Sequence, residues 1–352
     1  MSLAHRRTAV IENEQVRLTL LPGGGHIAEV LLKANGVNPL WNPPWESMEP
    51  SAYDRDEHTQ YGTPMEGGLL AGIAGHNLCF DFFGGPSEEE LAAGLHVHGE
   101  ASFVDWDVTA SGEEMTATAE LPIAQMRMER RLRLVGDVVL VRETARNLSG
   151  VDRPVGWTQH VTLGPPFLVK GETELHASAT SSKVSEEDFA PGYERLRLGA
   201  EFQWPYAPAA DGGWSDMRVF TDAPGSGAFT THLMAPGADE AFFCAYSPAT
   251  RTAFGYVWRR ADFPWLGIWE ENYSRKQEPW NGKTLTRGLE FGVSPYAETR
   301  RQMVDRGTLF GEKTFLWMPA GAEKTVEYAL FIRKSDAAPR AARRSGDGIE
   351  IG

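Results

Sequence analysis

One stretch, Arg131-Leu-Arg-Leu-Val-Gly-Asp-Val-Val-Leu-Val141, decides the fold class of this chain. Charged and apolar residues alternate over residues 131–135, as they do in a strand with one buried and one solvated face. The pair Gly136-Asp137 then separates this run from a second run that is rich in valine. A two-residue Gly-Asp connection between two such runs is typical of a tight hairpin. The stretch therefore predicts two antiparallel strands.

Similar strand signals lie near both ends of the chain. The runs Val16–Leu21 and His26–Leu32 flank the turn residues Pro22-Gly23-Gly24-Gly25 and predict a second strand pair. Near the other end, Thr314–Met318 and Thr325–Ile332 flank a loop that contains proline and glycine. We expect these two runs to form a closing hairpin.

Helix signals are few and short. Ser87 and Glu90 have the spacing of a capping box. Ser294-Pro295 resembles an N-cap and a first helical position, with Gly307 as the stop signal. Many short strands with frequent turns and little helix predict an all-β fold, specifically a large antiparallel β-sandwich with a few short helices.

Length and composition favour one large domain. The chain has 352 residues, of which 41% are hydrophobic, and its 11 Trp and 17 Phe supply a large core. We expect a single domain over residues 8–333, followed by a flexible tail over residues 334–352, which are polar and rich in Arg, Ala and Gly. Cys79 and Cys244 lie in hydrophobic runs and are expected to be buried free thiols.

Charge and hydropathy exclude two classes of partner. The net charge of −14 argues against nucleic acid, whose phosphates require a basic surface. The local cluster of Arg127, Arg130, Arg131 and Arg133 is interpreted as a solvated strand face. No run approaches the ~20 apolar residues that a membrane span requires. Because Met1–Val10 lacks the apolar core of a signal peptide, we expect a cytoplasmic protein.

The first candidate for chemistry is Glu290, which lies in the apolar, glycine-flanked segment Arg287–Pro295. Burial of an unpaired carboxylate costs several kcal/mol, so such a group is held by a partner or retained for chemistry. Upstream, His98 and His160 lie in similarly apolar segments marked by glycine. The three residues together indicate an acid/base site.

The segment around His98 allows more than one interpretation. His96, His98 and Glu100 alternate, so they would point to one face of a strand. His-x-His spacing suits a metal such as zinc or iron, although no second paired histidine motif supplies further ligands. The alternatives are a structural role and an acid/base or hydrogen-bonding role for His98.

A third segment, Phe263–Tyr273, mixes aromatic rings with carboxylates and an amide. Aromatic faces suit the apolar face of a sugar, and polar groups suit its hydroxyls. Trp269, Glu271 and Asn272 are therefore candidate substrate-binding residues, and a core position for the tryptophan with a solvated position for the glutamate is the alternative.

Residues 10–333 resemble the galactose mutarotase-like (aldose 1-epimerase) superfamily. The resemblance rests on four motifs that occur in order. They are Leu20-Leu-Pro-Gly-Gly-Gly-His-Ile27, Leu95-His-Val-His-Gly99 followed by Trp106, Gln159-His-Val161, and Leu289-Glu290 ahead of Pro295 and the C-terminal strands. The resemblance implies a β-sandwich whose concave face binds a sugar.

The resemblance also implies roles for individual residues. Glu290 resembles the general base of the family, His160 its general acid, and His98 the histidine that binds a sugar oxygen. The implied reaction interconverts sugar anomers, acts on a small-molecule sugar, and requires no metal or other cofactor. The loop 67–77 contains no arginine, where typical members carry an asparagine–arginine pair. His76 and Asn77 are candidates to replace those contacts, and His96 is a further candidate for substrate binding.

Three other function classes stay open at this point. The first is a non-enzymatic carbohydrate-binding protein, or a hydrolase or lyase on the same fold in which Glu290 pairs with Glu270 or Glu271. The second is a metal-dependent enzyme built on His96, His98 and Glu100. The third is an interaction protein that uses a tryptophan-rich face. The sequence does not specify the sugar or the oligomeric state.

Overall fold

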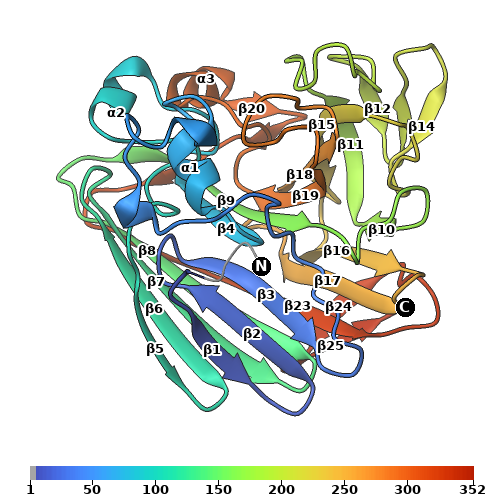
Figure 1. Cartoon of the computed structure of the whole chain (residues 1–352), viewed down its shortest axis with the longest axis horizontal. Coiled ribbons are helices and arrows are strands. Elements are labelled where there is room, and N and C mark those ends of the chain that lie inside the picture. The colour runs from blue at the N-terminus through green and yellow to red at the C-terminus, as the bar shows by residue number, and fades with distance from the viewer. Residues whose placement is uncertain (1–4) are drawn as a thin grey trace.

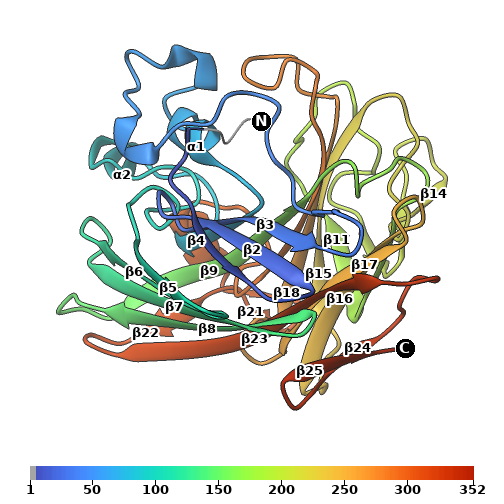
Figure 2. The ribbon, with the colours of Figure 1, turned by 60° about the horizontal axis from the view of Figure 1, so that its bottom comes forward.

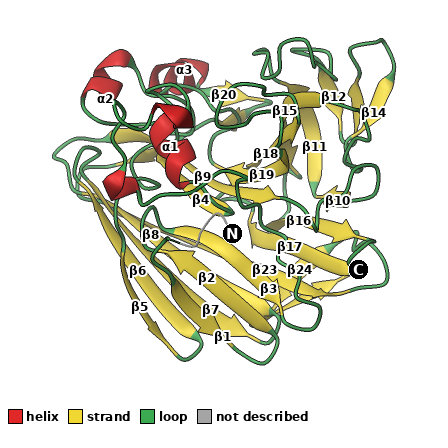
Figure 3. Cartoon of the chain, in the orientation of Figure 1, coloured by secondary structure: helices red, strands yellow, loops and turns green. Residues whose placement is uncertain are grey.

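The computed structural model describes residues 5–352 and is built mainly from two large antiparallel sheets (Figure 1). The sheets pack face to face, and the turned view shows the two layers (Figure 2). Helices are short and gather at one end of the molecule, whereas strands make up the rest (Figure 3). The predicted all-β sandwich is confirmed.

The first sheet carries the central strands of the molecule. Its strand order places β9 between β4 and β19, with β18 and β15 following. Its strands in spatial order are β1 (Ala9–Glu12), β2 (Val16–Leu21), β3 (His26–Leu32), β4 (His76–Asp81), β9 (Arg153–Leu163), β19 (Leu285–Gly292), β18 (Trp265–Asn272), β15 (Ser226–Met234), β11 (Ala179–Val184) and β12 (Glu201–Gln203), and β22 (Leu316–Met318) pairs with the start of β9.

The second sheet has eight strands. In spatial order they are β10 (Glu174–Ala177), β16 (Glu240–Ser247), β17 (Thr252–Arg259), β23 (Glu323–Lys334), β8 (Val138–Asn147), β7 (Met126–Val135), β6 (Glu114–Leu121) and β5 (Asp107–Ser111).

Short elements complete the described chain. The two-stranded pairs are β13 (Tyr206–Pro208) with β14 (Trp214–Asp216), β20 (Thr308–Leu309) with β21 (Glu312–Lys313), and β24 (Ala342–Ser345) with β25 (Gly348–Ile351). The helices are α1 (Gly67–Gly72), α2 (Glu88–Ala92), α3 (Arg300–Arg306), and the 3₁₀ turns η1 (Pro50–Ala52) and η2 (Thr59–Tyr61). No helix within residues 5–352 is long and apolar enough to cross a membrane.

A continuous apolar core fills the space between the two sheets. Trp258 of the second sheet stacks on Phe291 of the first, with ring centroids 4.4 Å apart. Leu78, Val161 and Leu289 reach the same core from β4, β9 and β19. Side chains alternate along a strand, so the residues next to these three on each strand point to the opposite, outer face of the first sheet.

A buried polar cluster is embedded in this core beneath β9. The carboxylate of Glu143 accepts hydrogen bonds from Arg130, Trp157, Gln159 and Tyr328. The Arg130 and Glu143 side chains are fully buried and 2.7 Å apart. Because four donors surround the carboxylate, the cost of burying this charge is offset locally.

The strand pairs predicted first are present in the structure. β2 pairs with β3 and β7 pairs with β8, both antiparallel. The interpretation of the arginine cluster needs one correction. Arg127, Arg131 and Arg133 project to solvent, but the Arg130 side chain points inward to Glu143. Arg130 occupies an inward-facing position of β7, where it packs over the ring of Trp106.

The predicted closing hairpin is wrong. β22 pairs with β9, and β23 lies between β8 and β17 in the other sheet. The two runs separate because Met318 is buried in the core beside the first sheet, whereas the longer β23 completes the second. Adjacency in sequence therefore did not determine strand pairing here.

The helix predictions hold only in part. The capping box of Ser87 with Glu90 begins α2, and Gly307 ends α3, as predicted. α3 begins after Thr299 rather than at Ser294-Pro295, because Thr299 and Gln302 form a reciprocal capping box.

The C-terminal segment differs from the flexible tail predicted for residues 334–352. It contains the hairpin β24–β25. Ala342 and Ile349 of this hairpin are buried against residues of the second sheet such as Val257 and Phe331. Burial of these apolar side chains stabilises the short hairpin against the second sheet. Cys79 and Cys244 are buried free thiols, as predicted.

Candidate active site

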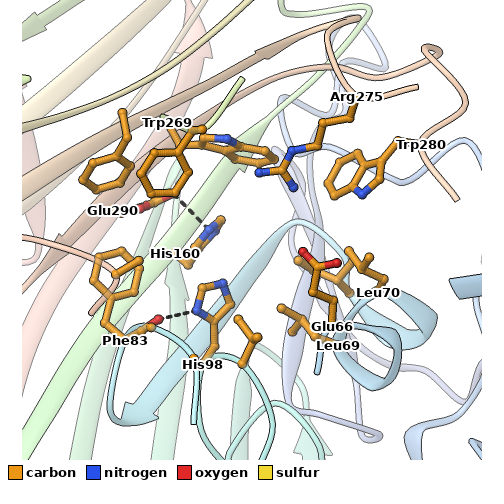
Figure 4. Close-up of a pocket in the computed structure, with 17 residues that line it drawn as sticks. Glu66, Leu69, Leu70, Phe83, His98, His160, Trp269, Arg275, Trp280 and Glu290 are labelled. Atoms are coloured by element: carbon orange, nitrogen blue, oxygen red, sulfur yellow. Dashed lines mark hydrogen bonds and ion pairs between the residues drawn. The ribbon is translucent and has the colours of Figure 1, made fainter. Parts of the chain in front are cut away.

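A pocket opens on the outer face of the first sheet (Figure 4). Its floor is formed by side chains of adjacent strands, with His160 from β9, Glu290 from β19 and Trp269 from β18. Its walls come from α1 and from the loops that follow β4 and β18.

Strand register fixes the residues of the floor in one row. Asn77, His160, Glu290 and Gly267 are direct partners across β4, β9, β19 and β18. Paired residues on neighbouring strands point to the same face, with Cβ atoms about 4.5–5.5 Å apart. The row therefore brings together residues that are as far apart in sequence as 77 and 290.

The central contact of the row joins Glu290 and His160. Nε2 of His160 lies 2.9 Å from Oε1 of Glu290, and both side chains are buried except where they line the pocket. The second ring nitrogen, Nδ1, lies 3.0 Å from Oγ1 of Thr162. A hydroxyl oxygen can accept as well as donate, so this partner permits an imidazole with one proton or with two.

Two glycines make room for the Glu290 carboxylate. A Cβ atom added at Gly288 would lie 2.4 Å from Oε1 of Glu290, and one added at Gly267 would lie 3.3 Å from Oε2. Gly288 is two residues before Glu290 on the same face, and Gly267 is its partner on β18. The carboxylate can therefore lie down along the sheet toward His160.

His98 approaches the same floor from the loop after α2. Its Nδ1 lies 2.5 Å from the carbonyl oxygen of Phe83 and donates to it. Burial, with the neighbouring His160, lowers the pKa of His98 to about 3. The ring is therefore neutral near pH 7, its proton is on Nδ1, and Nε2 is left as an acceptor. The His98 and His160 ring centroids are 5.1 Å apart.

Aromatic and charged side chains form the wall on the other side of the pocket. Trp269 and Trp280 meet edge to face, with centroids 6.0 Å apart. The guanidinium of Arg275 lies over both rings, and Glu66 reaches the pocket from the start of α1. Figure 4 shows Arg275, Glu66 and Trp280 on the side away from Glu290.

Three solved structures resemble this fold. A galactose mutarotase-like protein from Lactobacillus casei has 16% identity and a TM-score of 0.59, covering 93% of this chain and 100% of that one. A galactose mutarotase related enzyme from Lactobacillus acidophilus has 13% identity and a TM-score of 0.58, and the match covers 94% of this chain and 99% of that one. An aldose epimerase homologue from C. elegans has 10% identity and a TM-score of 0.61, and the match covers 94% of this chain and 99% of that one.

The chain has the galactose mutarotase-like fold. No family model matches the sequence, and no curated protein sequence matches it. At identities of 10–16% the likeness shows the fold alone. Activity must therefore be argued from the site.

Within this galactose mutarotase-like fold, Glu290, His160 and His98 meet in the pocket, and Trp269 lines its floor. His76 does not reach it and needs correction. Its ring lies between the sheets, with Nδ1 3.0 Å from the Tyr256 hydroxyl and Nε2 2.9 Å from Oε1 of Gln159. His76 is at a core-facing position of β4, so its role is structural. Asn77 belongs to the floor row but is fully buried beside Cys79 and does not line the pocket.

Glu271 and Asn272 also lie behind the pocket rather than in it. Glu271 accepts hydrogen bonds from the backbone of Ser274 and Arg275 and from the Ser274 hydroxyl. Asn272 donates to the carbonyl of Ala223. The Glu271 carboxylate and the Asn272 amide are occupied by these hydrogen bonds, which hold the loops in place. The two side chains therefore do not line the pocket, although they belong to a polar cluster in the sequence.

The residues of the suggested metal site are separated. Residues 95–98 form no strand, so His96, His98 and Glu100 do not share a face. The His96 ring stacks on Phe103 with centroids 3.8 Å apart. Glu100 accepts from the backbone of Ile123 and Ala124, which lie in the turn between β6 and β7. Among residues 5–352, no group of three or more His, Cys, Asp or Glu is placed to bind a metal ion.

Sequence reasoning missed Glu66 and Arg275 as pocket residues. Arg275 lies two residues after the aromatic segment Phe263–Tyr273, and its guanidinium lies in the pocket. The loop 67–77, which also lines the pocket, contains no arginine. Glu66 precedes a glycine pair in a loop with no periodic pattern. A density of tryptophan on both sides of Arg275 was the one available signal.

Proposed function

We propose that this protein is an aldose 1-epimerase-like isomerase that interconverts the α and β anomers of a small sugar. The observation that carries the proposal is the 2.9 Å contact between Glu290 and His160 on the floor of a pocket lined by aromatic side chains. A base and an acid in contact can move two protons in opposite directions on one substrate.

In the proposed reaction, Glu290 removes the proton from the C1 hydroxyl. The electron pair of that O–H bond forms the C1=O double bond, the bond from C1 to the ring oxygen breaks, and its electron pair goes to the ring oxygen. His160 gives its Nε2 proton to this oxygen, which yields the open-chain aldehyde. Rotation about the C1–C2 bond and reversal of both transfers close the ring as the other anomer.

The contact of Nδ1 with Oγ1 of Thr162 supports this role of His160. The hydroxyl can accept from Nδ1–H while the ring carries its second proton on Nε2. His98, neutral with a free Nε2, is suited to accept a hydrogen bond from a sugar hydroxyl, because a ring oxygen has no proton to donate. The role is therefore to orient the sugar.

A hydrolase based on Glu290 with Glu270 or Glu271 has less support. Glu270 pairs with Arg195 and Arg287, which lower its pKa although burial alone would raise it. Glu271 is engaged by the loop backbone. Neither residue lines the pocket with Glu290.

The test is polarimetry of α-D-glucose and α-D-galactose with wild type and Glu290→Gln. General acid/base groups contribute about 10²–10⁴-fold, so we expect a rate loss of that order in the variant. Glu57→Gln, an exposed carboxylate outside the pocket, is the matched control and is expected to retain the wild-type rate. An unchanged rate in Glu290→Gln would overturn the assignment, and sugar binding without mutarotation in wild type would favour a binding protein.

A further inference from the structure

Arg275 is a cation held inside the pocket by aromatic rings. Its guanidinium carbon lies 4.7 Å from the Trp280 ring centroid and 5.4 Å from that of Trp269. The side chain is 21% exposed, although it sits in the loop between β18 and β19. Figure 4 shows the guanidinium between the two tryptophans and turned toward the interior of the pocket. Stacking of this kind fixes the plane of the guanidinium.

A single carboxylate anchors Arg275 from behind. Oε2 of Glu271 lies 3.6 Å from Nε, which leaves the terminal nitrogens directed away from this partner. Glu271 also accepts from the backbone of Ser274 and Arg275, so it holds the loop and the base of the side chain together. Glu271 is thus a positioning residue for Arg275.

Glu66 presents the opposite charge on the same side of the pocket. It occupies the N-cap position of α1, yet its side chain makes no capping hydrogen bond. Glu66 is among the residues that line the pocket. Burial lowers the pKa of Arg275, and the charges of Glu271 and Glu66 oppose this shift. Figure 4 shows Glu66 below Arg275 and across the pocket from Glu290 and His160.

The chemistry of this pair indicates what it binds. A guanidinium only donates hydrogen bonds, and a carboxylate only accepts them. A sugar hydroxyl can accept one and donate one, so two adjacent hydroxyls can satisfy both side chains at once. A carboxylate or phosphate on the ligand would meet Arg275 favourably but would face the Glu66 charge.

We propose that Arg275 and Glu66 recognise two adjacent hydroxyl groups of a neutral sugar, at the end of the ring remote from the anomeric carbon. With C1 at Glu290 and His160, the remote end of a pyranose carries the hydroxyls on C3 and C4. This inference rests on the proposed function for the placement of C1.

The experiment measures binding of D-glucose and of its 3-deoxy and 4-deoxy analogues by tryptophan fluorescence, alongside polarimetry of D-glucose. The variants are Arg275→Met and Glu66→Gln, together with Arg275→Lys, which keeps the positive charge but lacks the planar guanidinium with its several donors. Lys276→Met, an exposed lysine in the same loop, and Glu57→Gln are the matched controls. Melting temperatures establish that each variant is folded.

Loss of a hydrogen bond to a charged group is expected to weaken D-glucose binding roughly 10- to 100-fold in Arg275→Met and Glu66→Gln. Wild type should bind at least one deoxy analogue as weakly as the variants bind D-glucose. The variants should bind that analogue no more weakly than wild type does, because the analogue already lacks the hydroxyl that the substituted side chain contacts. The two controls should bind as wild type.

Two results would overturn the hydroxyl pair. One is D-glucose binding that is unchanged in Arg275→Met and Glu66→Gln while wild type still mutarotates. The other is D-glucuronate binding that is tighter than D-glucose binding and that depends on Arg275 alone. Failure of wild type to bind or mutarotate any of these sugars would instead count against the proposed function.

Discussion

His160 and Glu290 are direct partners across two neighbouring strands, and their side chains meet at 2.9 Å on the face of the sheet that bears the pocket. Because the strands are held by a backbone ladder, the separation of the two groups is set by the fold rather than by loop conformation.

Gly288→Ala should displace the Glu290 carboxylate. The new Cβ would lie 2.4 Å from Oε1, closer than atoms can approach, so the carboxylate must leave the position in which it contacts His160. We expect at least a tenfold loss of mutarotation rate, because small misplacements of reacting groups are costly. Gly150→Ala is the control, since its Cβ would meet nothing within 4 Å. Equal rates in the two variants would contradict the packing argument.

The two histidines of the Leu95–Gly99 motif should respond differently to substitution by phenylalanine. His96→Phe should retain activity and fold stability, because the His96 ring stacks on Phe103 and its Nδ1 is buried without a partner. His98→Phe should lose activity, because it removes the acceptor Nε2 from the pocket. Polarimetry and thermal unfolding compare the two. A metal-dependent activity abolished by EDTA and by both substitutions would contradict this assignment.

Acid should destabilise the fold through buried neutral histidines. Burial lowers the pKa of His76 and His232 to about 3 and that of His26 well below its usual value. The unfolded chain binds protons at these sites near pH 6.5, whereas the folded protein does not. Their stabilising contribution is therefore complete above about pH 6.5 and is lost as the pH falls toward 3.

Below pH 6.5 the free energy of unfolding is expected to fall by roughly 1 kcal/mol per pH unit for each of these histidines. His98, whose pKa is also lowered to about 3, adds to the effect. Urea unfolding at pH 7.5, 6.0 and 5.5 measures it. A free energy of unfolding that stays constant from pH 7.5 to 5.5 would contradict the neutral, buried state of these rings.

Glu143→Gln should strongly destabilise the protein. It removes the negative charge that faces Arg130 in the core, where both side chains are fully buried. Breaking a buried pair from one side typically costs about 3–5 kcal/mol. Glu129→Gln is the matched control, because it breaks a pair with the exposed Arg131 and should cost about 1 kcal/mol or less. Equal effects of the two substitutions would refute the distinction.

Local patterns predicted much of the fold and the floor of the site. Alternation and turn chemistry identified β2, β3, β7 and β8, because these signals lie within adjacent residues. The incompatibility of a carboxylate with an apolar strand pointed to Glu290. The pairing of β22 with β9 was not predictable in this way, since it depends on which sheet buries Met318.

Side-chain direction set the limit for the site residues. His76 and Glu271 have the residue types of ligand-binding groups, but strand phase turns the first to the core and loop closure occupies the second. His96 and His98 alternate in sequence, yet the backbone between them is not extended: His98 has a φ of 71° and Gly99 a φ of 79°. A positive φ at a histidine cannot be foreseen from alternation.

The side chains of the pocket have two kinds of support. Glu290 and His160 are mounted on paired strands, and β9 is tied down from below because Gln159 bonds to Glu143. Glu66 and Arg275 instead come from connecting segments at the rim. Loop exchange could therefore retarget such a scaffold to other ligands while the pair beneath stayed in register, which makes these segments the natural place for diversification.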